Sequence, residues 1–260
     1  MRASATRADV AASVGLVLVI ALGWELSVRL GAIDPVLVSS PARIAAAAPG
    51  VLGSTRFLDD ATYSLTVFGS AVALAVAIGA PVGLLMGYSR LAHRVLHPLV
   101  VTFNSLPKVA LMPLIVLWVG LGRPAGVLLA TLMASFPVLI ATASGLEALE
   151  REHVQMARAF GAGRGLLLRR VVLPGVTPYL VSGLRVGVSY ALVGVILAEF
   201  FAASRGLGYR MVVTMQNFEV DAFFVCLIVV ALAAVTSTAA LRALERRLQA
   251  WRPVAFEAAS

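Results

Sequence analysis

The chain has 260 residues, of which 60% are apolar and only 13% are charged, and its mean hydropathy is +0.94. A water-soluble domain carries about 25% charged residues, so this composition excludes an ordinary soluble protein. The net charge of +8 is compatible with nucleic-acid binding, but the arginines fall in short clusters between apolar runs. We therefore interpret the charge as a membrane topology signal and expect the lipid bilayer, and no nucleic acid, as a partner.

Apolar runs long enough to cross a bilayer recur along the whole chain, about 20 residues being needed for each helix. We predict six spans, at residues 10–30, 61–88, 96–119, 124–145, 179–202 and 222–243. Arg2 and Arg7 precede the first run as in a secretory signal, but no small-residue cleavage site follows closely, so we expect an uncleaved span. The sequence thus predicts an all-α integral membrane fold in which residues 1–260 form one transmembrane domain.

The distribution of arginine predicts the orientation of these spans. Segments 1–9, 89–95, 146–178 and 244–260 together hold about twice as many arginines as the segments on the other side of the membrane. Because positively charged loops stay in the cytoplasm, this bias predicts that both termini are cytoplasmic. The segments 31–60 and 202–221 then lie outside, and we expect a short Ala-rich helix in the first of them.

The third predicted span contains three prolines, Pro98, Pro107 and Pro113. Each removes a backbone donor, so we expect this span to be kinked or broken. Lys108 follows the break, and Asn104 lies four residues earlier, so both could face one side. A charge within a span raises a functional hypothesis. Two interpretations stay open: Lys108 meets an anionic solute in transit, or it clamps the structure by pairing with Glu199 or with a backbone carbonyl.

Glu199 lies close to the outer end of the fifth predicted span. A carboxylate repels anions, so we interpret Glu199 as a structural or gating residue rather than as a solute ligand. Glu25 and Arg185 lie near span ends, where snorkelling to the interface is the simplest interpretation. The candidate residues of the translocation path are therefore Asn104, Lys108 and Glu199.

Signatures of chemistry on a substrate are absent from the sequence. It has no GxxxxGK[ST] phosphate loop, no HExxH and no GxSxG motif. Its one cysteine, Cys226, cannot form an intrachain disulfide, and no Cys/His cluster is present for a metal. We expect no catalytic residue, no metal site and no cofactor bound by this chain. Six spans suit the transport of a solute across a bilayer. The energy for this transport must come from a source that the chain itself does not supply.

The inner segment 146–178 has the pattern of a helix–turn–helix at the membrane surface. A run of helix-forming residues ends at Gly161-Ala162-Gly163, and a second run, Arg164 to Val172, should end at Leu173-Pro174-Gly175. Met156 and Phe160 lie four residues apart and share one face. Such a knuckle could insert into a groove on a partner protein, although a helix that rests on lipid headgroups fits the pattern equally well.

A family resemblance rests on this segment. The run from Gln155 to Gly161, QMARAFG, followed nine residues later by Val171-Val172-Leu173-Pro174, resembles the EAA loop of membrane subunits of ATP-binding-cassette (ABC) importers. That pattern is Glu-Ala-Ala, three residues, Gly, nine residues, Ile-x-Leu-Pro, and Gln155 and Met156 depart from it. The resemblance implies a coupling helix that docks in a cleft of an ATPase subunit. The coupling residues it implies are Gln155, Met156, Ala157, Arg158, Gly161, Leu173 and Pro174.

Other segments resemble the nitrate/sulfonate/taurine branch of these importers: residues 106–114 and 117–122, Ala198-Glu199 and Gly206-Leu207-Gly208-Tyr209. The resemblance covers nearly the whole chain and implies a type I ABC importer permease in the plasma (inner) membrane. It implies a homodimer with two cytoplasmic ATPase subunits, which bind ATP-Mg and do the hydrolysis, so that this chain is not itself an enzyme. A periplasmic or lipid-anchored solute-binding protein would deliver a small, anionic solute to the outer loops.

Two other functional classes stay open. A secondary transporter driven by an ion gradient should show inverted repeats with short broken helices in matching halves, whereas only the third predicted span looks broken. A non-transporting membrane scaffold is the other possibility. Co-purification with an ATPase subunit separates both from the ABC importer.

Overall fold

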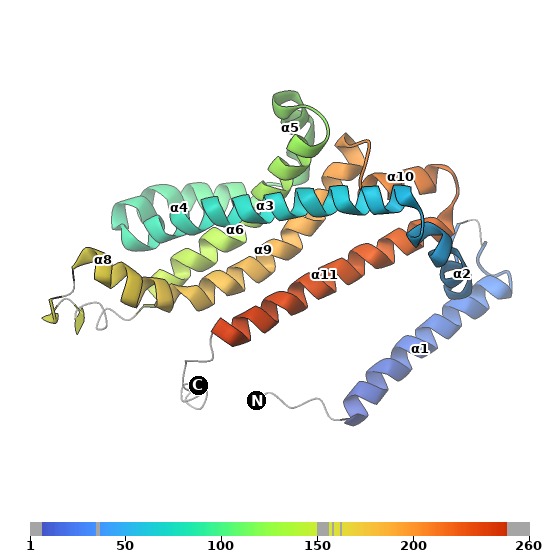
Figure 1. Ribbon diagram of the computed structural model, residues 1–260, viewed down its shortest axis with the longest axis horizontal. Coiled ribbons are helices and arrows are strands. Elements are labelled where there is room, and N and C mark those ends of the chain that lie inside the picture. The colour runs from blue at the N-terminus through green and yellow to red at the C-terminus, as the bar shows by residue number, and fades with distance from the viewer. Residues whose placement is uncertain (1–6, 35–36, 150–155, 158, 162, 249–260) are drawn as a thin grey trace.

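The computed structural model describes residues 7–34, 37–149, 156–157, 159–161 and 163–248, and in this part of the chain the regular structure is helical (Figure 1). The predicted all-α membrane fold is confirmed. In chain order the elements are α1 Arg7–Arg29, α2 Pro41–Leu52, α3 Thr55–Tyr88, α4 Arg90–Ser105, η1 Lys108–Leu111, α5 Met112–Val119, α6 Arg123–Glu147, α8 Arg164–Leu167, η2 Leu168–Val172, α9 Leu173–Ala202, α10 Leu207–Gln216 and α11 Val220–Leu248.

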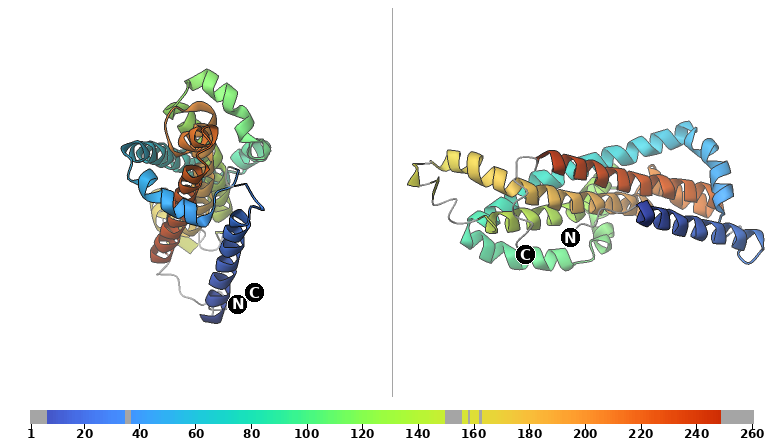
Figure 2. Two further views of the ribbon diagram at one scale, coloured as in Figure 1. Left: turned by 90° about the vertical axis from the view of Figure 1, so that its right-hand side faces the viewer. Right: turned by 90° about the horizontal axis from the view of Figure 1, so that it is seen from below.

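The long helices run roughly side by side along one axis of the molecule (Figures 1 and 2). Five of the described helices, α1, α3, α6, α9 and α11, are long and apolar enough to cross a membrane. The pair α4 and η1–α5 makes a sixth span if the two are taken together, although they are bent by 88°. The break falls at Leu106-Pro107, where the sequence predicts it, because Pro107 cannot donate a backbone hydrogen bond.

The fifth span is longer than predicted. Helix does not end at Leu173-Pro174-Gly175 but continues from α8 through η2 into α9, and residues 165–202 form one helical rod. The reason is a π-helical turn, in which Leu173 donates its backbone N–H to the carbonyl of Leu168, five residues earlier. The wider turn moves the preceding carbonyls away from the Pro174 ring, which in a regular α-helix would clash with the carbonyl four residues before it.

The segments outside the predicted spans also contain helices. The Ala-rich stretch forms α2, as predicted. Helix α3 begins at Thr55 rather than at residue 61, because Ser54 caps it by accepting a hydrogen bond from Phe57 N at 3.2 Å. Segment 202–221 is not a plain loop, since it contains the ten-residue helix α10.

Helix α6 is the centre of the bundle, with α3 on one side and α9 on the other. These helices approach closely because glycines line the contacts. A Cβ on Gly83 of α3 would lie 2.5 Å from the carbonyl oxygen of Leu139, and one on Gly183 of α9 would lie 2.5 Å from Ala141 Cβ. Close approach of small residues is the usual way in which helices associate in a bilayer.

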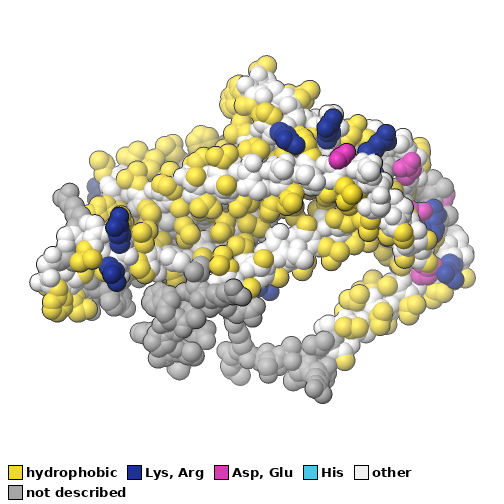
Figure 3. All heavy atoms as spheres, in the orientation of Figure 1, with side chains coloured by type: hydrophobic (Ala, Val, Ile, Leu, Met, Phe, Trp, Pro, Cys, Tyr) yellow, Lys and Arg dark blue, Asp and Glu magenta, His cyan; other side chains and the backbone are white. Residues whose placement is uncertain are grey.

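The two ends of the bundle differ. One end carries α2 and α10, and we call it the α10 end; the opposite end, with α8, we call the α8 end (Figure 1). Between them the surface is largely apolar (Figure 3). Helix α1 lies apart from the main bundle, with only 6% of its most apolar window buried. Most of its described side chains are therefore available for lipid or for another protein chain.

Candidate functional site

The first turn of α10 is held by side chains of other helices. Gly206 N donates to Asp60 Oδ1 at 2.9 Å, Leu207 N donates to Ser64 Oγ at 2.9 Å, and Gly208 N donates to Glu199 Oε2 at 2.8 Å. Asp60 and Ser64 lie one turn apart on α3, and Glu199 lies near the end of α9. A helix start normally satisfies such N–H groups with its own cap residue, which Gly206 cannot provide.

Glu199 is the central residue of this arrangement. It is 1% exposed, and its Oε1 accepts a hydrogen bond from Ser64 Oγ at 2.7 Å. One carboxylate therefore joins α9, α3 and α10. We call Asp60, Ser64, Glu199 and the three N–H groups of residues 206–208 the α10 clamp. Arg210 completes it from α10, because its Nε donates to Asp60 Oδ2 at 2.9 Å.

The clamp requires glycine at position 206. Gly206 has φ +112°, in the region that only glycine adopts easily. A Cβ at this position would also lie 2.3 Å from Glu199 Cδ. The Gly-Leu-Gly sequence thus serves both the turn and the approach of the carboxylate to the backbone.

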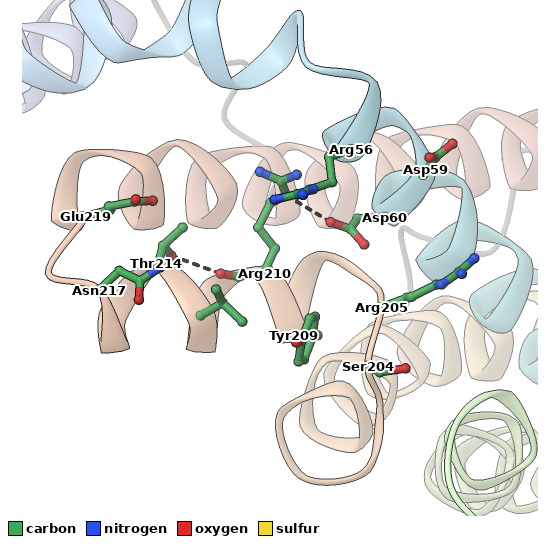
Figure 4. A pocket seen from close by; sticks show the side chains of 11 residues that line it. Arg56, Asp59, Asp60, Ser204, Arg205, Tyr209, Arg210, Thr214, Asn217 and Glu219 are labelled. Carbon is green, nitrogen blue, oxygen red and sulfur yellow. Dashed lines mark hydrogen bonds and ion pairs between the residues drawn. The ribbon is translucent and has the colours of Figure 1, made fainter.

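A pocket of about 510 Å³ opens beside the clamp at the α10 end (Figure 4). Asp60 and Arg210 of the clamp form part of its wall. Arg210 also has a buried nitrogen, Nη2, with no hydrogen-bond partner among the described residues. The other lining residues are Arg56, Asp59, Ser204, Arg205, Tyr209, Val213, Thr214, Asn217 and Glu219.

Lys108 and Asn104 lie together at the break between α4 and η1. Lys108 Nζ donates to the backbone carbonyl oxygen of Asn104 at 3.0 Å and lies 4.8 Å from the centre of the Phe136 ring. The Asn104 side chain is exposed. Of the partners considered for a clamp, the structure shows the backbone carbonyl and not Glu199, whose oxygens face Ser64 and Gly208. Phe136 lies 13 residues into α6, about 20 Å along the helix, so Lys108 is near the middle of the bundle.

The α8 end carries the described part of the predicted coupling segment. Met156 and Phe160 are 54% and 86% exposed, and Phe160 N donates to Met156 O at 3.0 Å, so these two form a helical turn that faces outward. Ala157 faces the other way and packs with Leu167 and Val176. Gly161 has φ +80°, a conformation that ends the helix as predicted.

The remaining coupling residues have mixed placements. Gln155 and Arg158 lie outside the described residues. Leu173 is 43% exposed, and Pro174 is half-buried at the start of α9. The structure thus brings Met156, Gly161 and Leu173 to the same end of the bundle, all three exposed, while Ala157 contributes to the chain's own core.

The two other charged residues predicted to snorkel have partners in the protein. Arg185 of α9 pairs with Glu245 of α11 at 2.5 Å. Glu25 of α1 pairs with Arg29 at 2.6 Å and accepts a hydrogen bond from Ala42 N of α2 at 3.0 Å. The first contact ties α9 to α11 and lies midway along the rod of residues 165–202 rather than near a span end, and the hydrogen bond from Ala42 ties α2 to α1.

Comparison with known proteins identifies the family. Residues 79–250 match the family model described as "Binding-protein-dependent transport system inner membrane component". The chain belongs to this family. The taurine transport system permease protein TauC of Escherichia coli K12 is 30% identical over 248 residues, which are 94% of this chain and 90% of that protein. The riboflavin transport system permease protein RibX of Chloroflexus aurantiacus is 31% identical over 228 residues, 88% of this chain and 85% of that protein.

Solved structures show the same fold. A chain of the MetNI methionine ABC transporter, in an inward-facing conformation, matches 74% of this chain and 96% of its own length, with a TM-score of 0.65 and 19% identity. The predicted resemblance to a type I ABC importer permease of the taurine and sulfonate branch is confirmed. The permease is accordingly a multi-pass inner-membrane subunit that works with a binding protein and with ATPase subunits, which carry out the hydrolysis. Family membership decides against an ion-gradient transporter and against a scaffold.

Sequence reasoning found Glu199 and the Gly-Leu-Gly sequence but missed the residues that join them. Asp60, Ser64 and Arg210 became visible only in the structure. A signal was present, because Asp60 and Ser64 are polar and spaced by one helical turn in a helix whose later part is largely apolar.

Proposed function

We propose that this permease forms the translocation path for a small anionic solute, as a homodimer with two cytoplasmic ATPase subunits that dock at the α8 end. The exposed turn of Met156 and Phe160 carries the proposal. It presents two large apolar side chains in a segment where arginines outnumber glutamates, and continuous helix links that end to the core of the bundle from residue 165 onward. Apolar anchors of this kind suit a groove on a partner protein.

The proposed docking site implies an orientation in the membrane. If the α8 end is cytoplasmic, then the arginine-rich segments 89–95 and 146–178 are inside, as the positive-inside rule requires. The α10 end, with α2, α10 and the pocket, then faces the periplasm and receives the solute-binding protein. Both termini are then cytoplasmic. Helix α1 crosses the membrane once from the cytoplasm to the α10 end, and α11 crosses once from the α10 end back to the cytoplasm.

The proposal for an anionic solute has two supports. Lys108 places a half-buried positive charge at the broken span, where a transported group can approach it. Relatives are named for taurine and for aliphatic sulfonates, both of which carry a sulfonate group. Other relatives are named for formylaminopyrimidine and riboflavin, so a test must compare sulfonates with such heterocycles.

Thiol crosslinking tests the docking site and the orientation together. In a Cys226→Ala background, Phe160→Cys at the α8 end and Met215→Cys at the α10 end each provide one exposed thiol. We expect Phe160→Cys to crosslink to the co-expressed ATPase subunit and Met215→Cys not to do so. A membrane-impermeant maleimide should label Met215→Cys from the periplasm, but should label Phe160→Cys only after the membrane is opened.

The opposite labelling pattern would show that the orientation is inverted. If Phe160→Cys is labelled only from inside and yet never captures the ATPase, the docking site is wrong.

For the solute, proteoliposomes with the assembled importer and its binding protein should take up taurine or an alkanesulfonate in preference to riboflavin. Preferential uptake of riboflavin would overturn the anion assignment.

A further inference from the structure

The α10 clamp is more extensive than the packing of a ten-residue helix requires. Three consecutive N–H groups at its start, which are unsatisfied in any isolated helix, are all bound by buried side chains of α3 and α9. Buried polar networks of this kind fix one geometry, because every alternative leaves a polar group without a partner. Helix α10 is therefore attached rigidly to α3 and α9 at its first turn.

Helix α9 connects this attachment to the opposite end of the molecule. Together with α8 and η2 it forms one helical rod of 38 residues, from residue 165 to residue 202, about 57 Å long. Glu199 lies one turn from the end of this rod, and the predicted coupling segment, residues 146–178, runs up to and into its beginning. Gly183, Gly187 and Gly194 pack the middle of the rod closely against α6, so this part passes on a displacement rather than bending, and the π-helical turn at residues 168–172 lies before it.

The pocket places the clamp within reach of a partner at the α10 end. Asp60 and Arg210 belong both to the clamp and to the wall of the pocket (Figure 4). A protein surface seated on this end would lie against Arg210 of α10 and close to the buried Asp60 that binds it.

We infer that α10 is a rigid outer arm of α9, and that Glu199 is the positioning residue through which movement of this arm is coupled to the ATPase-docking end. The inference rests on the proposed function. Docking of the solute-binding protein on α10 moves the α3–α9–α10 unit as one body, and the rod carries that movement to the segment before residue 165. In the reverse direction, closure of the ATPase subunits moves α10.

Spin-label distances in the assembled importer test this rigid-body movement. In a Cys226→Ala background, labels are placed at Met215 on α10 and at Phe201 on α9, which are 45% and 66% exposed. Single-label samples report the spacing between the two copies. Double-label samples, diluted with unlabelled chain, report the spacing within one copy. Both spacings are measured in the resting importer and again after the importer is trapped with ATP-Mg and vanadate.

We expect trapping to shift the spacing between copies at Met215 and at Phe201 together, while the Met215–Phe201 distance within one copy keeps its mean and width. A shift at Phe201 without one at Met215, or a change of the distance within one copy, would overturn the inference. If trapping changes no spacing although ATP is bound, the proposed function fails instead, so the two failures are distinguishable.

Variants of the clamp add a second measurement. Glu199→Gln keeps the size of the side chain but replaces one of the two acceptor oxygens with an amide donor. We expect the Met215–Phe201 distribution to broaden in this variant. Asp59→Asn is the matched control, because Asp59 lines the same pocket but makes no contact in the clamp. Broadening in Asp59→Asn equal to that in Glu199→Gln, or none in Glu199→Gln, would contradict the role of Glu199. If Glu199→Gln does not assemble, the wild-type distances alone decide.

Discussion

Lys108 donates a hydrogen bond from Nζ to the backbone carbonyl oxygen of Asn104, 3.0 Å away, across the break between α4 and η1. This carbonyl is one of the last in α4, where the helix leaves its C-terminal carbonyls without partners. A positive charge at that position also interacts favourably with the helix dipole, by about 0.3–1 kcal/mol. In the resting structure, Lys108 therefore stabilises the broken span, and a passing anion would have to compete with one neutral carbonyl.

Replacement of Lys108 tests its place in the translocation path. We expect Lys108→Ala to lower uptake about tenfold, which corresponds to loss of one charge-assisted contact, and Lys108→Glu to lower it further by repulsion. Assembly with the ATPase should remain intact. Uptake by proteoliposomes and co-purification measure the two properties. Lys108→Arg, which keeps the charge, is the control, and unchanged uptake in both Ala and Glu variants would remove Lys108 from the path.

The sequence was sufficient for the membrane fold because hydropathy is a property of single segments. The broken third span was also predictable, since each proline removes a donor wherever it stands. The continuation of α9 through Pro174 was not. It depends on the local choice between α and π hydrogen bonding at residues 168–173, and no property of an individual residue in that stretch reveals this choice.

The α10 clamp was beyond sequence reasoning for a different reason. Ser64 and Glu199 are 135 residues apart, and Asp60 and Gly206 are 146 apart. Sequence patterns report neighbours on one helix, whereas these contacts depend on how three helices meet. For the same reason the sequence could not choose between Glu199 and a backbone carbonyl as the partner of Lys108; the structure shows the carbonyl of Asn104, while the carboxylate of Glu199 is bound by Ser64 and Gly208.

A charge at Gly161 tests the coupling segment. Gly161 is exposed with φ +80°, and Gly163 is also exposed but has no positive φ. We expect Gly161→Asp to uncouple the complex, because a charged side chain beside Phe160 blocks insertion into an apolar groove. ATPase activity stimulated by the binding protein should fall to the unstimulated level. Gly163→Asp controls for added charge and should keep most of the stimulation. Normal stimulation in Gly161→Asp would count against the coupling assignment.

Substitution of Gly208 tests the stability of the α10 clamp. A Cβ at this position would lie 2.8 Å from both Glu199 Cβ and the backbone oxygen of Ile196, neither of which can move freely. We expect Gly208→Ala to destabilise the permease by about 1–3 kcal/mol and to lower its melting temperature in detergent. Gly69→Ala in α3, where nothing lies within 4 Å of the added methyl, should be neutral or stabilising. Equal melting temperatures for Gly208→Ala and wild type would show that the clamp is looser than the structure indicates.

The ion pair between Arg185 and Glu245 offers a test by charge exchange. It joins α9 to α11 with side chains that are 32% and 19% exposed, so solvent screens it only in part. We expect Arg185→Glu and Glu245→Arg each to lower the melting temperature, because each places two like charges together between the helices. The double variant restores an opposite pair and should recover part of the loss, with a coupling energy of about 1–2 kcal/mol. If the losses of the two single variants simply add in the double variant, the pair makes no net contribution and α11 is held to α9 by apolar packing alone.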